Sequence, residues 1–322
     1  MHIDWKDPES DCEIKKYNNY FISQAGRKYE IVNEIPRFVN NKSYTDNWGI
    51  QWNKFRKTQL DSYTKFPLSE DRLRRCLGDE IYSSLNKAIV LEAGCGAGRF
   101  TEILLANTAN VVSVDMSSAV EANQKNFPQN EQHFIVQSDI LKLPFVTQQF
   151  DIVICLGVIQ GTPSPEKTIK ALYGHVKPRG WLVLDHYIFS LSYYTQIVKI
   201  ISRLILRYTE PKKTFEIVNL LIEFFLPLHR IAKPSRLWQA IMRRVTPVVS
   251  YYYDFPDLSE ELQKEWAFLD THDILTDYYK HFLTLDQMNT ILQNLGMERI
   301  QCWRGGIGIE ARGRRPDTNL GS

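Results

Sequence analysis

The residues whose types and spacing most clearly predict chemistry are three glycines within the stretch VLEAGCGAGRF, residues 90–100. Gly94, Gly96 and Gly98 are spaced G-x-G-x-G, whereas the loop of a dinucleotide-binding site is spaced G-x-G-x-x-G. Glycines in such a loop let the backbone turn sharply and let a ligand approach the peptide N–H groups. Glu92 precedes the loop, and its carboxylate would repel a pyrophosphate and attract an ammonium group. The loop therefore indicates a ligand that carries a positive charge.

Two more carboxylates follow, each at the end of the next apolar run. Asp115 stands 21 residues after Gly94, where it could accept hydrogen bonds from the two hydroxyls of a ribose. Asp139 ends the third run and could accept from an exocyclic amine, while Ile140 could pack on a purine face. Three carboxylates at three successive run ends, with a glycine loop among them, fit an amino acid joined to an adenosine. That ligand is S-adenosylmethionine.

At these motifs the sequence resembles the class I S-adenosylmethionine-dependent methyltransferases, from about residue 86 to the end of the chain's last two β-like runs. VLEAGCGAGRFT is similar to the first motif of the family, VVSVDMSS to its ribose-binding segment and QSDILKLPF to its adenine-binding segment. FDIVICLGVIQ is similar to the fourth strand, and LYGHVKPRGWLVLD to the approach to the fifth. The resemblance implies methyl transfer, with S-adenosylmethionine as cofactor. It implies cofactor contacts from Glu92, Gly94, Cys95, Gly96, Gly98, Asp115, Met116, Asp139, Ile140, Leu156 and Gly157.

The N-terminal part carries a second resemblance. KYEIVNEIPRFV, residues 28–39, is similar to the end of a zinc-ribbon-like half-domain found in a subset of these enzymes. YTDNWGIQWNKF, residues 44–55, is similar to their aromatic cover over the cofactor, which implies cofactor contacts from Gln51 and Trp52. The paired cysteines of the ribbon are absent, because Cys12 stands alone. We therefore expect no zinc and no other metal.

Candidates for contact with the methyl acceptor follow the fifth strand or precede the final helix. Methyl transfer from a sulfonium depends mainly on alignment, and a general base matters when a hydroxyl must lose its proton. His186 and Tyr187 follow the fifth strand, and His272 and Asp273 precede the final helix. Each histidine can equally be structural. Related sequences often have a histidine after the fourth strand where this chain has Gln160, which argues against a base at that position.

The elements that must position these residues alternate along the chain. Runs rich in Val, Ile and Leu are separated by helix-length intervals, which indicates parallel strands covered on both faces. The expected strands are 88–92, 111–115, 133–137, 151–156 and 181–186, and the expected helices are 99–106, 117–126 and 166–176. Ser117 is expected to cap the second helix. The pattern predicts a doubly wound α/β core, and the resemblance implies a mostly parallel, seven-stranded, Rossmann-like sheet.

After residue 190 the strand pattern stops, and apolar residues recur at helical spacing until about residue 280. The prolines of this stretch are expected to divide it into short helices: Pro211, Pro227, Pro234 and Pro247. A helix over 285–295 and an antiparallel hairpin of strands 299–303 and 307–312 are expected to complete the core. We thus expect four parts: an N-terminal arm covering the cofactor site (1–60), a Rossmann-like core (61–189), a helical cap (190–280) and the C-terminal part of the core (281–322).

The charge of the chain is unevenly distributed. The total of 39 Lys and Arg against 37 Asp and Glu excludes a uniformly basic nucleic-acid binder, and we expect no nucleic-acid partner. Residues 190–250 hold ten Lys and Arg against three Glu, and residues 251–286 hold nine acidic residues against two Lys. Three interpretations of the cap stay open: a solvated helical cap, a lid that sets substrate specificity, and a peripheral membrane contact through 190–250.

Function and location follow from these features. We expect methyl transfer to an O or N acceptor of a small-molecule biosynthetic intermediate by in-line displacement. A nucleic-acid or protein methyltransferase and a non-catalytic, S-adenosylmethionine-binding regulatory protein are the alternatives. The first ten residues, MHIDWKDPES, contain no apolar run, so no signal peptide is expected, and five scattered cysteines favour a reducing cytoplasm. The sequence leaves the oligomeric state and the substrate open.

Overall fold

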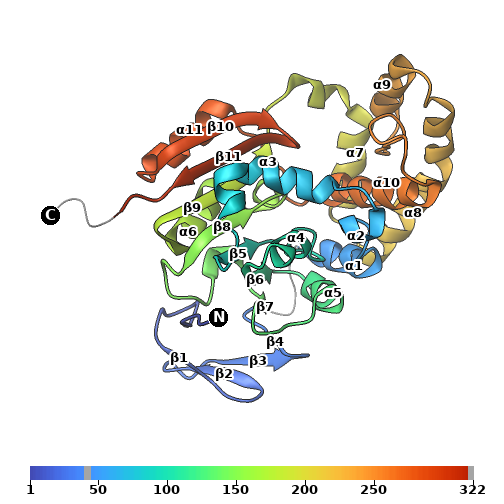
Figure 1. Cartoon of the computed structure of the whole chain (residues 1–322). Helices are drawn as coiled ribbons and strands as arrows, with labels where there is room; N and C mark the ends of the chain where they lie inside the picture. The colour runs from blue at the N-terminus through green and yellow to red at the C-terminus, as the bar shows by residue number, and fades with distance from the viewer. Residues whose placement is uncertain (40–44, 318–322) are drawn as a thin grey trace.

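The computed structural model describes residues 1–39 and 45–317. Its centre is a seven-stranded sheet in the order β10-β11-β9-β8-β5-β6-β7, which crosses the middle of Figure 1. Strands β5 to β9 run parallel, and β10 and β11 form an antiparallel hairpin that pairs with β9 through β11. The doubly wound α/β fold predicted from the sequence is confirmed. The strands are β5 (Ile89–Ala93), β6 (Asn110–Asp115), β7 (His133–Gln137), β8 (Phe150–Cys155), β9 (Val176–Tyr187), β10 (Glu298–Gly305) and β11 (Gly308–Arg314).

Two hydrophobic clusters cover opposite faces of this sheet. Along β5, Val90 belongs to one cluster and Leu91 to the other, because successive side chains of a strand point to opposite faces. Helices α3 and α4 pack on the Val90 side, and α6 and α11 pack on the Leu91 side. The helices around the sheet are α3 (Leu68–Ser83), α4 (Thr101–Ala106), α5 (Ala119–Asn126), α6 (Pro165–His175) and α11 (Leu285–Asn294).

The N-terminal part is more ordered than the sequence indicated. Four short strands form an antiparallel sheet at the bottom of Figure 1, beside the edge strand β7. The N–H of Phe38 donates to the carbonyl of Gln137 on β7 at 2.8 Å, which fixes this sheet to the core. Strands of two to five residues are too short to show a period in the sequence. They are β1 (Ile14–Lys16), β2 (Tyr20–Ser23), β3 (Lys28–Val32) and β4 (Ile35–Pro36).

Two helices continue this part toward the core. They are α1 (Asp46–Lys54) and α2 (Asp61–Thr64). Helix α1 holds most of the segment that resembles an aromatic cover, whereas Tyr44, at the start of that segment, lies outside the described residues. Figure 1 places α1 at the side of the molecule where α8 and α10 also lie.

The cap is a helical unit with its own hydrophobic cluster. Val218, Ile222 and Leu226 of α8 pack against Ala267 and Phe268 of α10. The expectation that four prolines divide this stretch is wrong at Pro227, which lies inside the 21-residue helix α8. The packing of Ile222 and Leu226, which precede Pro227 in the helix, offsets the hydrogen bond that proline cannot donate. The cap helices are α7 (Ile197–Leu206), α8 (Pro211–Ile231), α9 (Arg236–Val245) and α10 (Glu260–Thr276).

We searched the described residues for a helix able to cross a bilayer. None combines the necessary length with the necessary apolar composition.

Candidate active site

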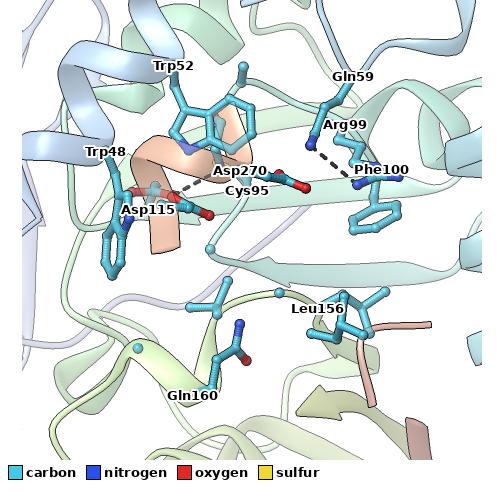
Figure 2. A pocket seen from close by; sticks show the side chains of 18 of the residues that line it. Trp48, Trp52, Gln59, Cys95, Arg99, Phe100, Asp115, Leu156, Gln160 and Asp270 are labelled. Atoms are coloured by element: carbon cyan, nitrogen blue, oxygen red, sulfur yellow. Dashed lines mark hydrogen bonds between the residues drawn. The ribbon is translucent and has the colours of Figure 1, made fainter. Parts of the chain in front are cut away.

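A pocket of about 650 Å³ lies at the carboxyl ends of the parallel strands. Its walls come from α1, the glycine loop after β5, the residues following β6, β7 and β8, and one face of α10. Open α/β sheets bind ligands at this end of their strands. Figure 2 shows Trp52 above Asp115 and Cys95, Trp48 beside Asp115, and Gln160 below them.

The glycine loop takes a backbone conformation that requires glycine. Gly94 has a φ of +80°, and a Cβ placed on it would lie 2.3 Å from Cγ2 of Val158. The N–H groups of Gly94 and Cys95 donate to the carbonyl of Val114 at 2.7 and 2.9 Å, which fixes the loop to β6. Gly94, Cys95 and Gly96 all line the pocket, as the sequence predicted.

Asp115, at the end of β6, is held by the backbone around it. Its carboxylate accepts from the N–H of Gly96 at 2.9 Å and from the N–H and hydroxyl of Ser117 at 2.8 and 2.7 Å. Burial raises the pKa of this carboxyl, and these hydrogen bonds oppose the shift. The expectation that Ser117 caps α5 is wrong, because α5 begins at Ala119 after the cap position Ser118. Ser117 instead orients Asp115 in the pocket.

The other predicted cofactor contacts divide into two groups. Seven further predicted contacts line the pocket together with the loop and Asp115. Of the residues named from the sequence, those that line it are Gln51, Trp52, Gly94, Cys95, Gly96, Asp115, Met116, Asp139, Ile140, Leu156 and Gly157. Asp139 also accepts from the N–H of Leu141 at 2.9 Å, which orients the short turn that carries Ile140.

Glu92 and Gly98 do not line the pocket. The carboxylate of Glu92 lies behind the loop, where it accepts from the hydroxyls of Thr101 at 2.5 Å and Ser113 at 3.0 Å. Burial raises its pKa to about 7. A Cβ on Gly98 would lie 2.8 Å from the ring of Phe127, so this glycine allows close packing between the loop and the end of α5. Their predicted contact with the cofactor is corrected to a role in holding the loop.

Helix α1 covers the pocket with aromatic side chains. The ring of Trp52 approaches the position of a Cβ on Gly96 to 3.4 Å, and the ring of Trp48 approaches that of Gly161 to 3.0 Å. Figure 2 shows both indoles on the same side as Asp115. Trp48 was not singled out from the sequence, although it lies within the segment that resembles the aromatic cover.

Three aspartates at the C-terminal end of α10 form the acidic side of the pocket: two lie in the helix, and Asp277 follows it. Asp270, Asp273 and Asp277 are spaced by three and four residues, share one helix face and line the pocket. The hydroxyl of Tyr251 donates to Asp270, and Lys280 forms an ion pair with Asp277 at 3.1 Å. Burial raises the pKa of Asp270 to about 6, and burial together with the neighbouring acids raises the pKa of Asp273. The sequence analysis singled out only Asp273, although the spacing would have revealed the shared face.

Arginines line the same pocket as these aspartates. Arg99 lines the pocket, donates to Ser69 Oγ at 2.9 Å and to Gln59 Oε1 at 3.3 Å, and is visible in Figure 2. Burial lowers its pKa to about 9. Arg72 also lines the pocket and pairs with Asp185, which in turn accepts from the N–H of Gly157 at 2.5 Å. The pair thereby orients the turn after β8.

Of the four predicted acceptor contacts, Tyr187 and Asp273 line the pocket, whereas the two histidines do not. His186 precedes Tyr187 on β9 and points to the other face of the strand, where Nδ1 lies 2.9 Å from the carbonyl of Tyr187. His272 is buried against Phe268, with its ring centroid 5.8 Å from that of the phenyl group. Burial lowers the pKa of both imidazoles, that of His272 to about 4. Neither histidine lines the pocket in which the acceptor would bind.

His272 nevertheless reaches the pocket through Gln51. Nδ1–H of His272 donates to Oε1 of Gln51 at 2.5 Å, and the amide nitrogen of Gln51 donates to Asp273 at 3.3 Å. Gln51 is fully buried, so this chain of hydrogen bonds connects α1 to the acidic face of α10.

Comparison with known proteins agrees with this geometry. A family model described as "Methyltransferase domain" matches residues 91–184. Residues 91–184 are a methyltransferase domain. The resemblance to the class I S-adenosylmethionine-dependent methyltransferases is confirmed for this domain, and S-adenosylmethionine is its cofactor. No comparison tests the resemblance of residues 28–39 to a zinc ribbon, which stays a prediction.

The curated relatives match the methyltransferase domain and little beyond it. A ubiquinone biosynthesis O-methyltransferase of Coxiella burnetii is 36% identical over 95 residues, which are 29% of this chain and 41% of that protein. A protein of the same name from Rickettsia felis is 31% identical over 106 residues, which are 32% and 43% of the two chains. The chain thus spans less than half the length of these two relatives.

Solved structures with a similar course of the chain include two methyltransferases. Magnesium protoporphyrin IX methyltransferase of Synechocystis PCC 6803, solved with bound SAH, is 14% identical with a TM-score of 0.45, over 84% of this chain and 96% of that one. An O-methyltransferase family protein of Burkholderia thailandensis is 12% identical with a TM-score of 0.47, over 80% and 60%.

Proposed function

We propose that this protein transfers the methyl group of S-adenosylmethionine to an O or N atom of a small-molecule biosynthetic intermediate. One observation supports this above all: a single pocket contains both the predicted cofactor contacts around Asp115 and the acidic face of α10. When bound, S-adenosylmethionine supplies an electrophilic methyl group. Asp115, Asp139 and the glycine loop would hold it at the strand ends, and the acceptor would lie between it and α10.

We further propose that Asp273 accepts the proton that the acceptor loses. Among the described residues no lysine or arginine forms an ion pair with Asp273, whereas Asp277 is paired with Lys280. Burial and the neighbouring acids raise the pKa of Asp273, and a carboxylate with a raised pKa is a stronger base than an exposed one. Gln51 and His272 would act as positioning residues, because they hold the carboxylate through the hydrogen bonds described above.

The walls of the acceptor side favour a substrate with planar or apolar bulk. Tyr187, Tyr251, Phe255 and Trp266 line the pocket near the aspartates. These rings favour a small molecule, because small-molecule pockets are lined mainly by apolar and aromatic side chains. The name of the curated relatives, ubiquinone biosynthesis O-methyltransferase, supports an oxygen acceptor.

The remaining assignments are proposals of the same kind. We divide the chain into a cofactor-covering N-terminal part (1–60), the core (61–189), the cap (190–280) and the C-terminal part of the core (281–322). All five cysteines are free thiols in the structure, which supports a cytoplasmic location.

Incubation with S-adenosylmethionine labelled in the methyl group tests the proposed function. The purified protein is mixed with a small-molecule extract of its source cell, and products are analysed by mass spectrometry for the gain of one labelled methyl group. Asp273→Asn is the test variant, and Asp257→Asn, at an exposed position outside the pocket, is the matched control. A labelled product with the wild type and the control, and much less with Asp273→Asn, supports the proposal. If protein that binds S-adenosylhomocysteine labels nothing in the extract, the proposal of a small-molecule acceptor is rejected.

A further inference from the structure

Large apolar side chains gather on the outside of the cap. Among the described residues 24 large apolar side chains are exposed, and 18 of them lie between Phe189 and Tyr253. Scattered exposed apolar residues are normal in a folded protein, whereas a large contiguous group indicates an interaction surface. The concentration of exposed apolar side chains in this one segment therefore indicates an interaction surface on the cap.

Helix α7 presents such a group along one face. Ile197, Ile201, Leu204 and Tyr208 follow one another at intervals of three and four residues, and all are about half exposed or more. The opposite face of α7 packs on α10, where Leu206 is buried. The short 3₁₀ helix before α7, η3 (Leu191–Thr195), adds Leu191, which is 75% exposed.

Helix α9 presents a second group next to the first. Its exposed apolar side chains are Leu237, Trp238, Ile241 and Val245, with exposed fractions of 36% to 70%. Helices α7 and α9 are in contact, so the two groups of exposed side chains are neighbours. A hollow of about 320 Å³ lies between η3 and α9. Figure 1 places α9 at the end of the molecule farthest from β1–β4. We call the exposed side of residues 191–208 and 236–245 the outer cap face.

The charged residues within the outer cap face are basic, and Asp254, an acid beside it, pairs with Arg243. Residues 191–209 and 233–253 contain no Asp or Glu. Their basic residues are Lys199, Arg203, Arg207, Lys233, Arg236, Arg243 and Arg244. Three of these arginines, Arg236, Arg243 and Arg244, line the hollow beside η3, and Arg243 pairs there with Asp254. Arg236 lies over the ring of Tyr253, and Arg244 donates only to the carbonyl of Ala240 in its own helix.

We propose that the outer cap face binds the surface of an anionic phospholipid bilayer. Amphipathic helices with exposed apolar side chains flanked by Lys and Arg bind in this way, with the apolar face in the headgroup region. Guanidinium groups pair well with phosphate, so Arg236 and Arg244 are suited to lipid headgroups. A second copy of the chain would place the arginines of this face opposite the same arginines of its partner, which disfavours self-association through this face. The proposal does not depend on the methyl acceptor.

Co-sedimentation of the full chain with vesicles tests this proposal. One set of vesicles is phosphatidylcholine alone, and the other is equal parts phosphatidylcholine and phosphatidylglycerol. We expect binding to the second set and little to the first. Raising the salt from about 0.1 M to about 1 M shortens the screening length from about 10 Å to about 3 Å and should weaken binding.

Two variants separate the contributions of charge and apolar contact. Arg236→Gln with Arg244→Gln should weaken binding about 30-fold. Each basic residue near an anionic surface strengthens binding about fivefold, and the two contributions multiply. Leu237→Glu with Ile241→Glu should weaken it by at least about tenfold through lost apolar contact. The matched controls are Arg304→Gln and Val146→Glu, which change exposed residues outside the cap and should bind as the wild type does. Thermal unfolding followed by circular dichroism verifies that all variants are folded.

Three results would overturn the proposal. The first is no binding to either set of vesicles. The second is binding by the folded cap variants that equals wild-type binding. The third is a dimer in analytical ultracentrifugation that the cap variants dissociate while the controls do not, which would assign the outer cap face to a second copy of the chain.

Discussion

At the scale of single residues, Asp115 is oriented before any ligand binds. Its carboxylate accepts from the N–H groups of Gly96 and Ser117 and from the Ser117 hydroxyl. Each carboxylate oxygen has two lone pairs, and these three bonds leave one of them, on Oδ2, for a ligand hydroxyl. Because Gly96 belongs to the glycine loop, one side chain fixes both the loop and a predicted ribose contact. The position is therefore sensitive to substitution in two ways.

We expect Asp115→Ala to weaken the binding of S-adenosylhomocysteine by roughly ten- to a hundredfold. A hydrogen bond to a charged group contributes about 1.5–3 kcal/mol, and the substitution also frees the Gly96 N–H. Isothermal titration calorimetry measures the change. Asp286→Ala, at an exposed position of α11, is the control and should bind normally. Unchanged affinity of the Asp115 variant would show that this carboxylate does not contact the ligand.

Glu92 predicts a dependence of stability on pH. Burial raises its pKa from 4.5 to about 7, so the folded state holds a proton that the unfolded state has released between these values. Its contribution to stability is therefore fully present below about pH 4.5 and is lost as the pH rises to about 7. Glu92→Gln removes this titration. Relative to the wild type, the variant should gain up to about 3 kcal/mol between pH 5 and pH 8.

Urea unfolding of both proteins at the two pH values measures that difference. Subtracting the wild type from the variant cancels the titration of other buried acids such as Asp270, whose pKa is also raised. Asp286→Asn serves as a control whose difference should stay near zero. An equal difference at both pH values would mean that Glu92 titrates normally in the folded protein.

At the scale of elements, the sequence predicted regular structure wherever its signal was local. The parallel strands and the C-terminal hairpin came from runs of Val, Ile and Leu, and each lies within a few residues of its expected bounds. Strands β1–β4 were missed because each is too short to show a period. Pro227 was expected to end a helix, but tertiary packing of α8 overrides its local preference.

The candidate site divides in the same way. Contacts from the glycine loop and the strand ends could be predicted because motif spacing fixes them. The acidic face of α10 was predicted only in part: Asp273 was named as a candidate, whereas Asp270 and Asp277 were considered only as part of a charged segment. Their position near the glycine loop depends on how the cap folds back over the sheet, which no local pattern records. The contact between Gln51 and His272, 221 residues apart, has the same origin.

Helix α10 provides a kinetic test. Asp273→Asn should reduce kcat by about 10²–10⁴-fold, the range typical for loss of a general base. S-adenosylhomocysteine affinity should stay within about twofold, because the predicted cofactor contacts are not altered. His272→Ala should reduce kcat less and change its pH profile, since His272 acts only through Gln51. Equal losses of kcat and cofactor affinity in Asp273→Asn would instead indicate a structural role.

At the scale of the whole molecule, the near-neutral total charge conceals a spatial separation. The acidic segment does not simply neutralise the basic one. Among the described residues, two ion pairs join the basic residues of 190–250 to the acidic residues of 251–286: Arg230 with Glu260 and Arg243 with Asp254. Asp270, Asp273 and Asp277 line the pocket, while Arg236, Arg243 and Arg244 of α9 line the hollow beside the outer cap face. The cap thus places acidic side chains in the pocket and arginines on its outer face.

Because the pocket is built from three parts of the chain, cofactor binding should stabilise all three together. Ligand at about 100 times its dissociation constant adds about 2.7 kcal/mol to the stability of the folded state. Hydrogen exchange with and without S-adenosylhomocysteine should therefore show slower exchange in the glycine loop, in α1 (Asp46–Lys54) and in α10 (Glu260–Thr276). Strands β1–β3 contribute no residue to the described pocket lining and should change least. Protection confined to residues 89–157 would show that neither α1 nor the cap closes on the bound cofactor.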